Sequence, residues 1–192
     1  IAQGVDTAFG VPGESYLAVL DGFHEHRDHI RFIACRQEGG AAFMAEAQGK
    51  LTGRPGVAFV TRGPGATNAS AGVHVARQDS TPMILFVGQI ARADRDREAF
   101  QEVDYRAMFG PLAKWVAEID QTGRIPEYVA RAFHLAMSGR PGPVVLALPE
   151  DMLSARAEVG DLPAWSAPLA DVAPAAVARI AQALAGAERP LV

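Results

Sequence analysis

The hydrophobic pattern of the chain alternates between short, almost continuous apolar runs and longer stretches with apolar residues at helical spacing. Short apolar runs that are rich in β-branched and aromatic residues are typical of strands buried on both faces of a sheet. The pattern predicts strands at residues 6–11, 31–35, 57–61, 82–88, 115–119 and 144–148.

The stretches between these runs predict helices. For example, Ile125, Val129, Phe133 and Met137 share one helical face. Helices are expected at residues 14–26, 38–51, 66–77, 100–108, 122–138 and 175–185. Because strands alternate with helices, the predicted fold class is α/β, a doubly wound six-stranded parallel sheet with helices on both faces.

Composition divides the chain into three segments. Residues 1–160 are expected to form the sheet domain, and the Pro- and Ala-rich residues 161–173 a linker. Residues 174–192 then begin a further domain, with a helix and the start of a strand at 189–192. Residues 1–5 have the pattern of a last helical turn closed by a glycine, so we expect the sequence to be part of a longer protein.

Composition and charge favour a globular protein that binds neither nucleic acid nor membranes. Of the 192 residues, 49% are hydrophobic and 21% are charged, and the net charge is −4, without a basic patch or polybasic run. The apolar run at residues 83–87 is about the longest, and it is far shorter than the roughly 18 residues of a membrane span. Cys35 is the only cysteine, which excludes an intrachain disulfide and fits a cytoplasmic protein.

Two of the predicted strand ends carry the candidate chemistry. Residues 33–35 lead into Arg36-Gln37-Glu38-Gly39-Gly40, and residues 57–61 lead into Gly63-Pro64-Gly65. A strand that ends at a glycine-rich corner before a helix exposes backbone N–H groups at the carboxyl edge of the sheet, where open α/β sheets bind ligands. Glu38 is therefore expected at a ligand-binding edge, although a glutamate in a first helical turn often only complements the helix dipole.

Three other features give weaker indications of a site. Gly63-x-Gly65-x-x-Asn68 resembles a dinucleotide fingerprint, but its third glycine is replaced and no acidic residue ends a following strand; it is not a P-loop either. The polar run at residues 24–29 contains three histidines, but one such run gives no defined ligand spacing, so we predict no metal site. Cys35 lacks a neighbouring base in sequence, which favours a buried strand-end residue over a nucleophile.

Seven short motifs occur in order along residues 9–144. They are FGVPGE (9–14), RQEGG (36–40), GPGATN (63–68), DSTP (79–82), GQ (88–89), AFQE (99–102) and SGRPGPV (138–144). In this order and spacing they resemble the pyrimidine-binding domain of thiamine-diphosphate-dependent enzymes, most closely the acetolactate synthase (acetohydroxyacid synthase) group. The resemblance covers the chain to about Asp151 and implies the thiamine-diphosphate-binding fold.

The resemblance also implies roles for individual residues. Glu38 matches the glutamate that hydrogen-bonds N1′ of the cofactor's aminopyrimidine, which lets N4′ act as the base at C2. Gln101 matches a side chain that reaches the cofactor and the reaction intermediate, so Glu38 and Gln101 are the predicted catalytic residues. The predicted cofactor-binding residues are Val11, Pro12, Gly13, Glu38, Thr61, Pro64, Asn68 and Gln101.

The implied cofactor is thiamine diphosphate, which the family holds with Mg²⁺ through a Gly-Asp-Gly…Asn-Asn segment that is absent from this sequence. The diphosphate and Mg²⁺ are therefore expected on a C-terminal domain supplied by a partner subunit, and this chain alone is expected to be inactive. FAD is a possible further cofactor of the full-length enzyme. The expected assembly is a homodimer or homotetramer, whose chains could approach closely at the small residues of 39–47 and 65–75. Arg62 departs from the family, in which a small residue usually precedes Gly-Pro-Gly.

The activity implied is decarboxylation of a 2-oxo acid and transfer of the resulting carbanion to an acceptor, as in acetolactate synthase. A 2-oxo acid decarboxylase or oxidase of the same superfamily is one alternative, and a non-catalytic assembly domain is an alternative of another class. Glu38 favours an enzyme, because assembly alone does not require it. The donor and acceptor substrates stay open, since their pockets would draw on further domains.

Overall fold

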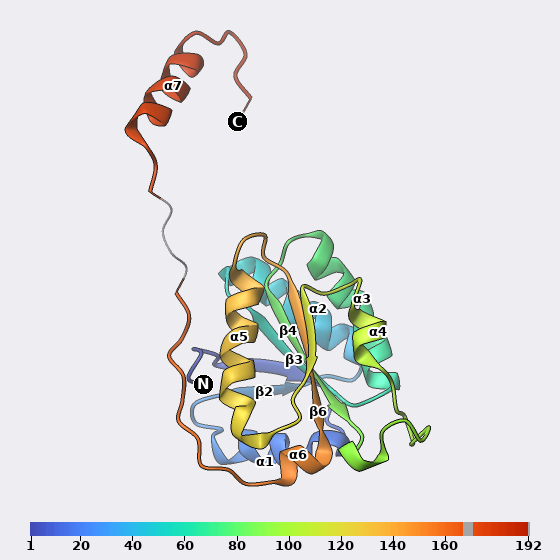
Figure 1. The fold of residues 1–192 in the computed structure, drawn as a ribbon. Helices are drawn as coiled ribbons and strands as arrows, with labels where there is room; N and C mark the ends of the chain where they lie inside the picture. The colour runs from blue at the N-terminus through green and yellow to red at the C-terminus, as the bar shows by residue number, and fades with distance from the viewer. Residues whose placement is uncertain (167–170, 192) are drawn as a thin grey trace.

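A six-stranded parallel sheet lies at the centre of the computed structural model, which describes residues 1–166 and 171–191 (Figure 1). The strands are β1 (Thr7–Gly10), β2 (Arg31–Ala34), β3 (Gly56–Val60), β4 (Met83–Gln89), β5 (Trp115–Glu118) and β6 (Pro143–Pro149). Their order in the sheet is β2-β1-β3-β4-β6-β5, and every pairing is parallel. The predicted α/β sheet is confirmed.

Helices cover both faces of this sheet, as the alternating pattern predicted (Figure 1). The α-helices are α1 (Leu17–Glu25), α2 (Glu38–Thr52), α3 (Pro64–Gln78), α4 (Tyr105–Phe109), α5 (Ile125–Met137), α6 (Glu150–Ser154) and α7 (Pro174–Ala185), and short 3₁₀ turns lie at Glu14–Tyr16, Arg92–Asp94 and Thr122–Arg124. One core joins the sheet to α2, α3 and α4, and the other joins it to α1, α5 and α6.

The sheet separates the two cores because successive residues of a strand point to opposite faces. In β4, Met83, Leu85 and Val87 belong to the core with α2 and α3. Ile84 and Phe86, between them, belong to the core with α5. All residues of β4 are buried, which explains why its sequence is continuously apolar rather than alternating.

The small residues of α2 and α3 bring these two helices and the sheet close together. A β-carbon added at Gly72 would lie 2.6 Å from the β-carbon of Ala42, and one added at Gly49 would lie 2.3 Å from the carbonyl oxygen of Pro82. The close approach is therefore made within the chain. The outer surface of α2 keeps Phe43 and Met44 exposed, at 42% and 47% of their full surface.

The region around residues 100–108 differs from the sequence-based expectation. The helix predicted over these residues is wrong in its first half, because α4 begins only at Tyr105. Gln101 has a left-handed backbone (φ 66°), so a right-handed α-helix cannot continue through it. The side chain of Asp104 then caps α4 by accepting from the N–H groups of Arg106 and Ala107.

The ends of the chain also differ from the expectation. Residues 1–5 form a turn, with the N–H of Gly4 donating to the carbonyl of Ile1, rather than the last turn of a helix. α6 was not predicted. α7 lies where a helix was expected and has no buried residue. Residues 189–191 form no strand; Val192 and residues 167–170 of the predicted linker lie outside the described residues.

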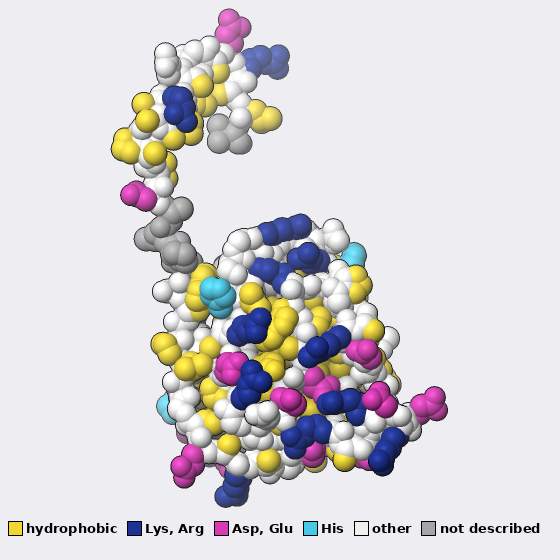
Figure 2. Space-filling view, in the orientation of Figure 1, with side chains coloured by type: hydrophobic (Ala, Val, Ile, Leu, Met, Phe, Trp, Pro, Cys, Tyr) yellow, Lys and Arg dark blue, Asp and Glu magenta, His cyan; other side chains and the backbone are white. Residues whose placement is uncertain are grey.

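Charged side chains of both signs are interspersed over the face of the sheet domain seen in Figure 2. Within the described ranges, no helix combines the length and hydrophobicity needed to cross a membrane. The same part of the chain contains no group of three or more His, Cys, Asp or Glu side chains placed to hold a metal ion.

Candidate functional site

The loops that follow β1, β2 and β3 meet at the carboxyl edge of the sheet. These three strands are parallel neighbours in the order β2-β1-β3, so their carboxyl ends lie side by side. The loop after β1 contains residues 11–13, the loop after β2 leads to Glu38, and the loop after β3 leads through Thr61 to α3. The topology therefore gathers three of the predicted cofactor-binding segments at one edge.

Glu38 is the first residue of α2, and its carboxylate faces α3. The N-terminus of α2 is capped by the preceding residue, Gln37, whose side-chain oxygen accepts from the N–H of Gly40 at 3.0 Å. Glu38 is therefore not needed as the cap. Its Oε2 instead accepts a hydrogen bond of 2.9 Å from the side-chain amide of Asn68. Asn68 thus fixes one carboxylate oxygen of the half-buried Glu38.

Two glycines pack directly against Thr61 beside this carboxylate. A β-carbon added at Gly65 would lie 2.9 Å from Thr61 Cγ2 and 3.5 Å from Glu38 Oε1. A β-carbon added at Gly13 would lie 2.6 Å from the β-carbon of Thr61. Because neither glycine carries a side chain, Thr61 can lie against the backbone at both positions and fills the space that their β-carbons would occupy. Oε1 of the half-buried Glu38 is not the oxygen that Asn68 bonds. The residues present thus fit an aminopyrimidine that offers a ring nitrogen to Glu38.

Gln101 reaches the same edge from the loop between β4 and α4. A β-carbon added at Gly63 would lie 2.8 Å from the β-carbon of Gln101, so the loop packs directly on the corner before α3. The N–H of Gly63 donates to the hydroxyl of Tyr105 at 2.9 Å, and that hydroxyl donates to the carbonyl of Gly88. Burial raises the pKa of Tyr105 to about 12, which keeps this hydroxyl protonated and able to donate.

The loop that carries Gln101 is closed by a carboxylate. Glu102 accepts hydrogen bonds from the backbone N–H groups of Asp96 (2.7 Å) and Ala99 (3.0 Å). These N–H groups, that of Asp96 first, lower the pKa of Glu102 below its usual value, since they stabilise the charged form. The loop is therefore held partly by its own side chain.

The structure brings the predicted residues together partly by direct contacts and partly through an intervening residue. Glu38, Asn68, Thr61 and Gly13 are linked by direct contacts or close packing, and Gln101 joins them through Gly63. Pro64 begins α3 beside them, Pro12 is exposed in the loop after β1, and the carbonyl of Val11 accepts from the hydroxyl of Tyr16.

Sequence reasoning missed two residues that hold this site. Ser15 is fully buried, and its hydroxyl shares a hydrogen bond of 2.8 Å with the Thr61 hydroxyl. Arg62 is buried among side chains of distant segments. The only signal for Arg62 was its size at a corner where the family has a small residue. Ser15 gave no signal beyond that of a turn residue.

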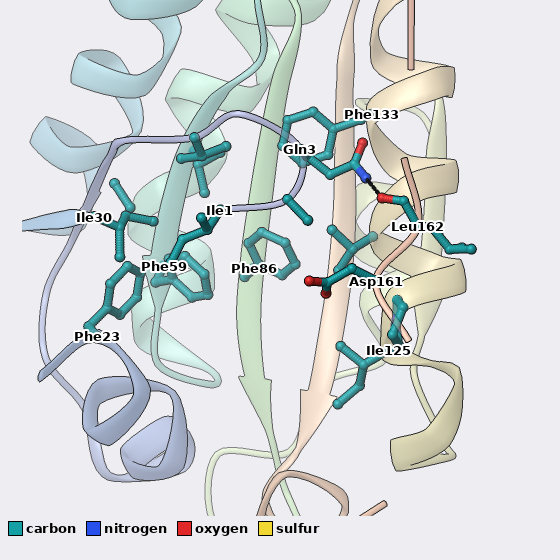
Figure 3. A pocket seen from close by; sticks show the side chains of 16 residues that line it. Ile1, Gln3, Phe23, Ile30, Phe59, Phe86, Ile125, Phe133, Asp161 and Leu162 are labelled. Atoms are coloured by element: carbon teal, nitrogen blue, oxygen red, sulfur yellow. Dashed lines mark hydrogen bonds between the residues drawn. The ribbon is translucent and has the colours of Figure 1, made fainter. Parts of the chain in front are cut away.

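A separate cavity of about 250 Å³ lies between the sheet and helices α1 and α5 (Figure 3). Figure 3 shows Phe23, Phe59, Phe86 and Phe133 around it. Its polar lining residues are Gln3, whose amide donates to the carbonyl of Leu162, and Asp161. A ligand site usually combines an apolar pocket with several polar groups that point into it. The predicted site residues do not line this cavity but lie at the carboxyl edge of the sheet.

Comparison with known proteins identifies the protein family to which the chain with this site belongs. Residues 1–108 match the family model described as thiamine pyrophosphate enzyme, N-terminal TPP binding domain. The chain therefore belongs to this family. All eight predicted site residues lie within the matched range, between Val11 and Gln101.

The curated relatives of this chain include several acetolactate synthases. It is 40% identical over 191 residues to the catabolic acetolactate synthase of Raoultella terrigena, covering 99% of this chain and 34% of that protein. It is 37% identical over 185 residues to the acetolactate synthase of Bacillus subtilis (strain 168), covering 96% of this chain and 32% of that protein. With the acetolactate synthase isozyme 3 large subunit of Escherichia coli (strain K12), it shares 42% identity over 154 residues, covering 80% and 27%. The chain thus spans about a third, or less, of these relatives.

Proposed function

We propose that the full-length protein uses thiamine diphosphate to decarboxylate a 2-oxo acid and to transfer the remaining carbon fragment to an acceptor, in an acetolactate synthase-like reaction. The observation that carries the proposal is the Glu38 carboxylate, held by Asn68 beside Gly65 and Thr61 at the carboxyl edge. The similarity to acetolactate synthases supports the reaction class.

Glu38 has one oxygen available for the ligand. Asn68 bonds Oε2, whereas Oε1 lies over Gly65. In the proposed site, Oε1 shares a proton with the ring nitrogen of the pyrimidine. Bound thiamine diphosphate supplies a carbon nucleophile and an electron sink for the carbonyl of the 2-oxo acid, so that CO₂ can leave. Gln101 orients the substrate from the neighbouring loop.

The remaining parts of the site come, in this proposal, from outside the chain. A C-terminal domain of a partner subunit supplies the ligands for Mg²⁺ and the diphosphate, which need carboxylate and carbonyl oxygens in an octahedral shell. The surface of α2 supports a subunit contact, because Phe43 and Met44 are exposed on the helix that begins with Glu38. Phe100, 73% exposed beside Gln101, supports the same contact. The proposed assembly is a homodimer or homotetramer, with FAD as a further possible cofactor.

The proposal is tested with the full-length protein and pyruvate, in the presence of thiamine diphosphate and Mg²⁺. We expect CO₂ release together with acetolactate, identified by NMR. Release of acetaldehyde alone would indicate a decarboxylase, and consumption of O₂ with release of acetate would indicate an oxidase. A protein that neither binds thiamine diphosphate nor releases CO₂ from any 2-oxo acid would contradict the proposal and leave the assembly function.

A further inference from the structure

We propose that Arg62 is a positioning residue that sets the place of Gln101 in the cofactor site, an inference that rests on the proposed function. Arg62 is only 7% exposed, and each of its three guanidinium nitrogens bonds a different segment. Nη2 donates to Glu14 and Nη1 donates to Glu150, each at 2.9 Å. Nε donates to the carbonyl of Phe100 at 3.2 Å.

Two of these three contacts, those with Glu14 and Phe100, lie one residue away from the predicted cofactor-binding segments. Glu14 directly follows Gly13, and Phe100 directly precedes Gln101. Arg62 itself belongs to the corner that follows β3. A planar guanidinium has fixed donor directions, so it holds its three partners in a defined arrangement, which a single ammonium group does not. Arg62 therefore ties the loop after β1 and the loop of Gln101 to the corner after β3.

The backbone of Gln101 needs such support. Its φ of 66° is left-handed, a conformation that a residue other than glycine keeps only when its surroundings hold it. On one side, Arg62 holds the carbonyl of the peptide that enters Gln101, and Gly63 packs against its β-carbon. On the other side, the hydrogen bonds of Glu102 close the loop. Without Arg62, this backbone is free to relax and to carry the Gln101 side chain away from the cofactor.

The surroundings of Arg62 allow it to be replaced without loss of the fold. Its two carboxylate partners are at the surface, with side chains of Glu14 and Glu150 exposed by 70% and 44%. Removal of the arginine leaves these carboxylates in water rather than buried without a partner, which limits the cost in stability. The methionine side chain of Arg62→Met fills much of the vacated space.

A double-mutant cycle in the full-length protein separates positioning from a general structural role. With a 2-oxo acid as substrate, Arg62→Met should lower kcat by about 100-fold, the effect of a misplaced catalytic group. The double variant Arg62→Met/Gln101→Ala should be within about twofold of Gln101→Ala alone, because Arg62 acts through Gln101. Arg62→Lys keeps the charge but lacks the planar guanidinium, and its kcat should lie between those of the wild type and Arg62→Met. Arg124→Ala, which removes an exposed ion pair with Glu127, is the control and should match the wild type.

Hydrogen exchange gives a second readout that needs neither cofactor nor turnover. The N–H of Glu102 donates to the carbonyl of Ala99, and the N–H of Ala99 donates to the Glu102 carboxylate. Both amides should exchange at least about tenfold faster in Arg62→Met, as expected for a loop that opens locally. Arg62→Lys serves the same comparison should Arg62→Met not fold.

Three results would overturn the inference: unchanged exchange in this loop, a kcat of Arg62→Met like that of the wild type, or losses that multiply in the double variant. A wild-type protein without activity on 2-oxo acids would instead overturn the proposed function. In that case, the exchange rates would still decide whether Arg62 holds the loop of Gln101.

Discussion

Two charged side chains at the carboxyl edge are held in opposite ways. Glu38 is half-buried, and the hydrogen bond that it accepts from Asn68 engages a single carboxylate oxygen. Arg62 is almost fully buried, and all its guanidinium nitrogens bond other segments. A buried charge must be paired and hydrogen-bonded, whereas a partly exposed one can keep a free oxygen in contact with water. The comparison indicates that Glu38 is available to a ligand and that Arg62 serves to hold the loops.

This difference predicts that function and stability respond separately to changes at Glu38. In the full-length protein, Glu38→Gln keeps the shape of the side chain and removes its charge. Turnover should fall by about 10²-fold or more, the usual contribution of acid–base groups, while Tm changes little. Exchange of the C2 proton of bound cofactor, followed by NMR, should slow to a similar degree.

Glu127→Gln is the matched control for this change, because Glu127 is an exposed glutamate whose carboxylate is paired with Arg124, and it lies in α5, on the opposite face of the sheet from α2 and α3. It should leave turnover unchanged. C2 proton exchange at the wild-type rate in Glu38→Gln would remove the basis for assigning a catalytic role to Glu38, and an equal loss of turnover in both variants would mean that the effect is not specific.

The next largest effect is expected at Gly65, beside Glu38. In Gly65→Ala the new β-carbon would lie 2.9 Å from Thr61 Cγ2, so Thr61 or α3 must shift, which displaces the side chains around the Glu38 carboxylate. We expect the Kd for thiamine diphosphate in the full-length protein to rise about tenfold, equivalent to about 1.4 kcal/mol, measured by calorimetric titration.

Gly40→Ala provides the comparison for this variant. Gly40 lies in the first turn of α2, and a β-carbon added there would meet nothing within 4 Å. Alanine is favoured over glycine in a helix by roughly 0.5–1 kcal/mol, so Gly40→Ala should stabilise the protein slightly and leave the Kd unchanged. Equal affinities of the two variants would show that the ring does not lie against Gly65.

The two regions also differ in how well the sequence predicts them. The strands and the corner between β3 and α3 were predicted because their signals are local: an apolar run for β4, and glycines and a proline at Gly63-Pro64-Gly65. Arg62 is joined to Glu14 and Glu150, which lie 48 and 88 positions away in sequence, and no local pattern specifies such pairs.

The error at residues 100–108 has the same origin. Their composition is compatible with a helix, and the left-handed backbone of Gln101 follows from contacts with Arg62 and Gly63 that only the folded chain makes. The position of Gln101 could therefore be predicted from the sequence only through the family resemblance. Tertiary contacts decide its conformation, whereas local propensity decides that of the strands.

The smallest expected effect concerns the loop on the other side of Gln101, where Glu102 rather than Arg62 makes the hydrogen bonds. The N–H groups of Asp96 and Ala99 lower the pKa of Glu102 from its usual value of 4.5. A carboxyl group with a lowered pKa in the folded state stabilises that state above its unfolded pKa, and this contribution is lost as the pH falls through the folded pKa. The loop should therefore be equally protected between pH 7 and about pH 5 and open more often below pH 4.5.

Amide exchange of Asp96 and Ala99, corrected for the intrinsic dependence of exchange on pH, measures this opening. Glu102→Gln should remove the dependence on pH; if both proteins gave the same profile, the protection of the loop would come from Arg62 and Gly63 alone.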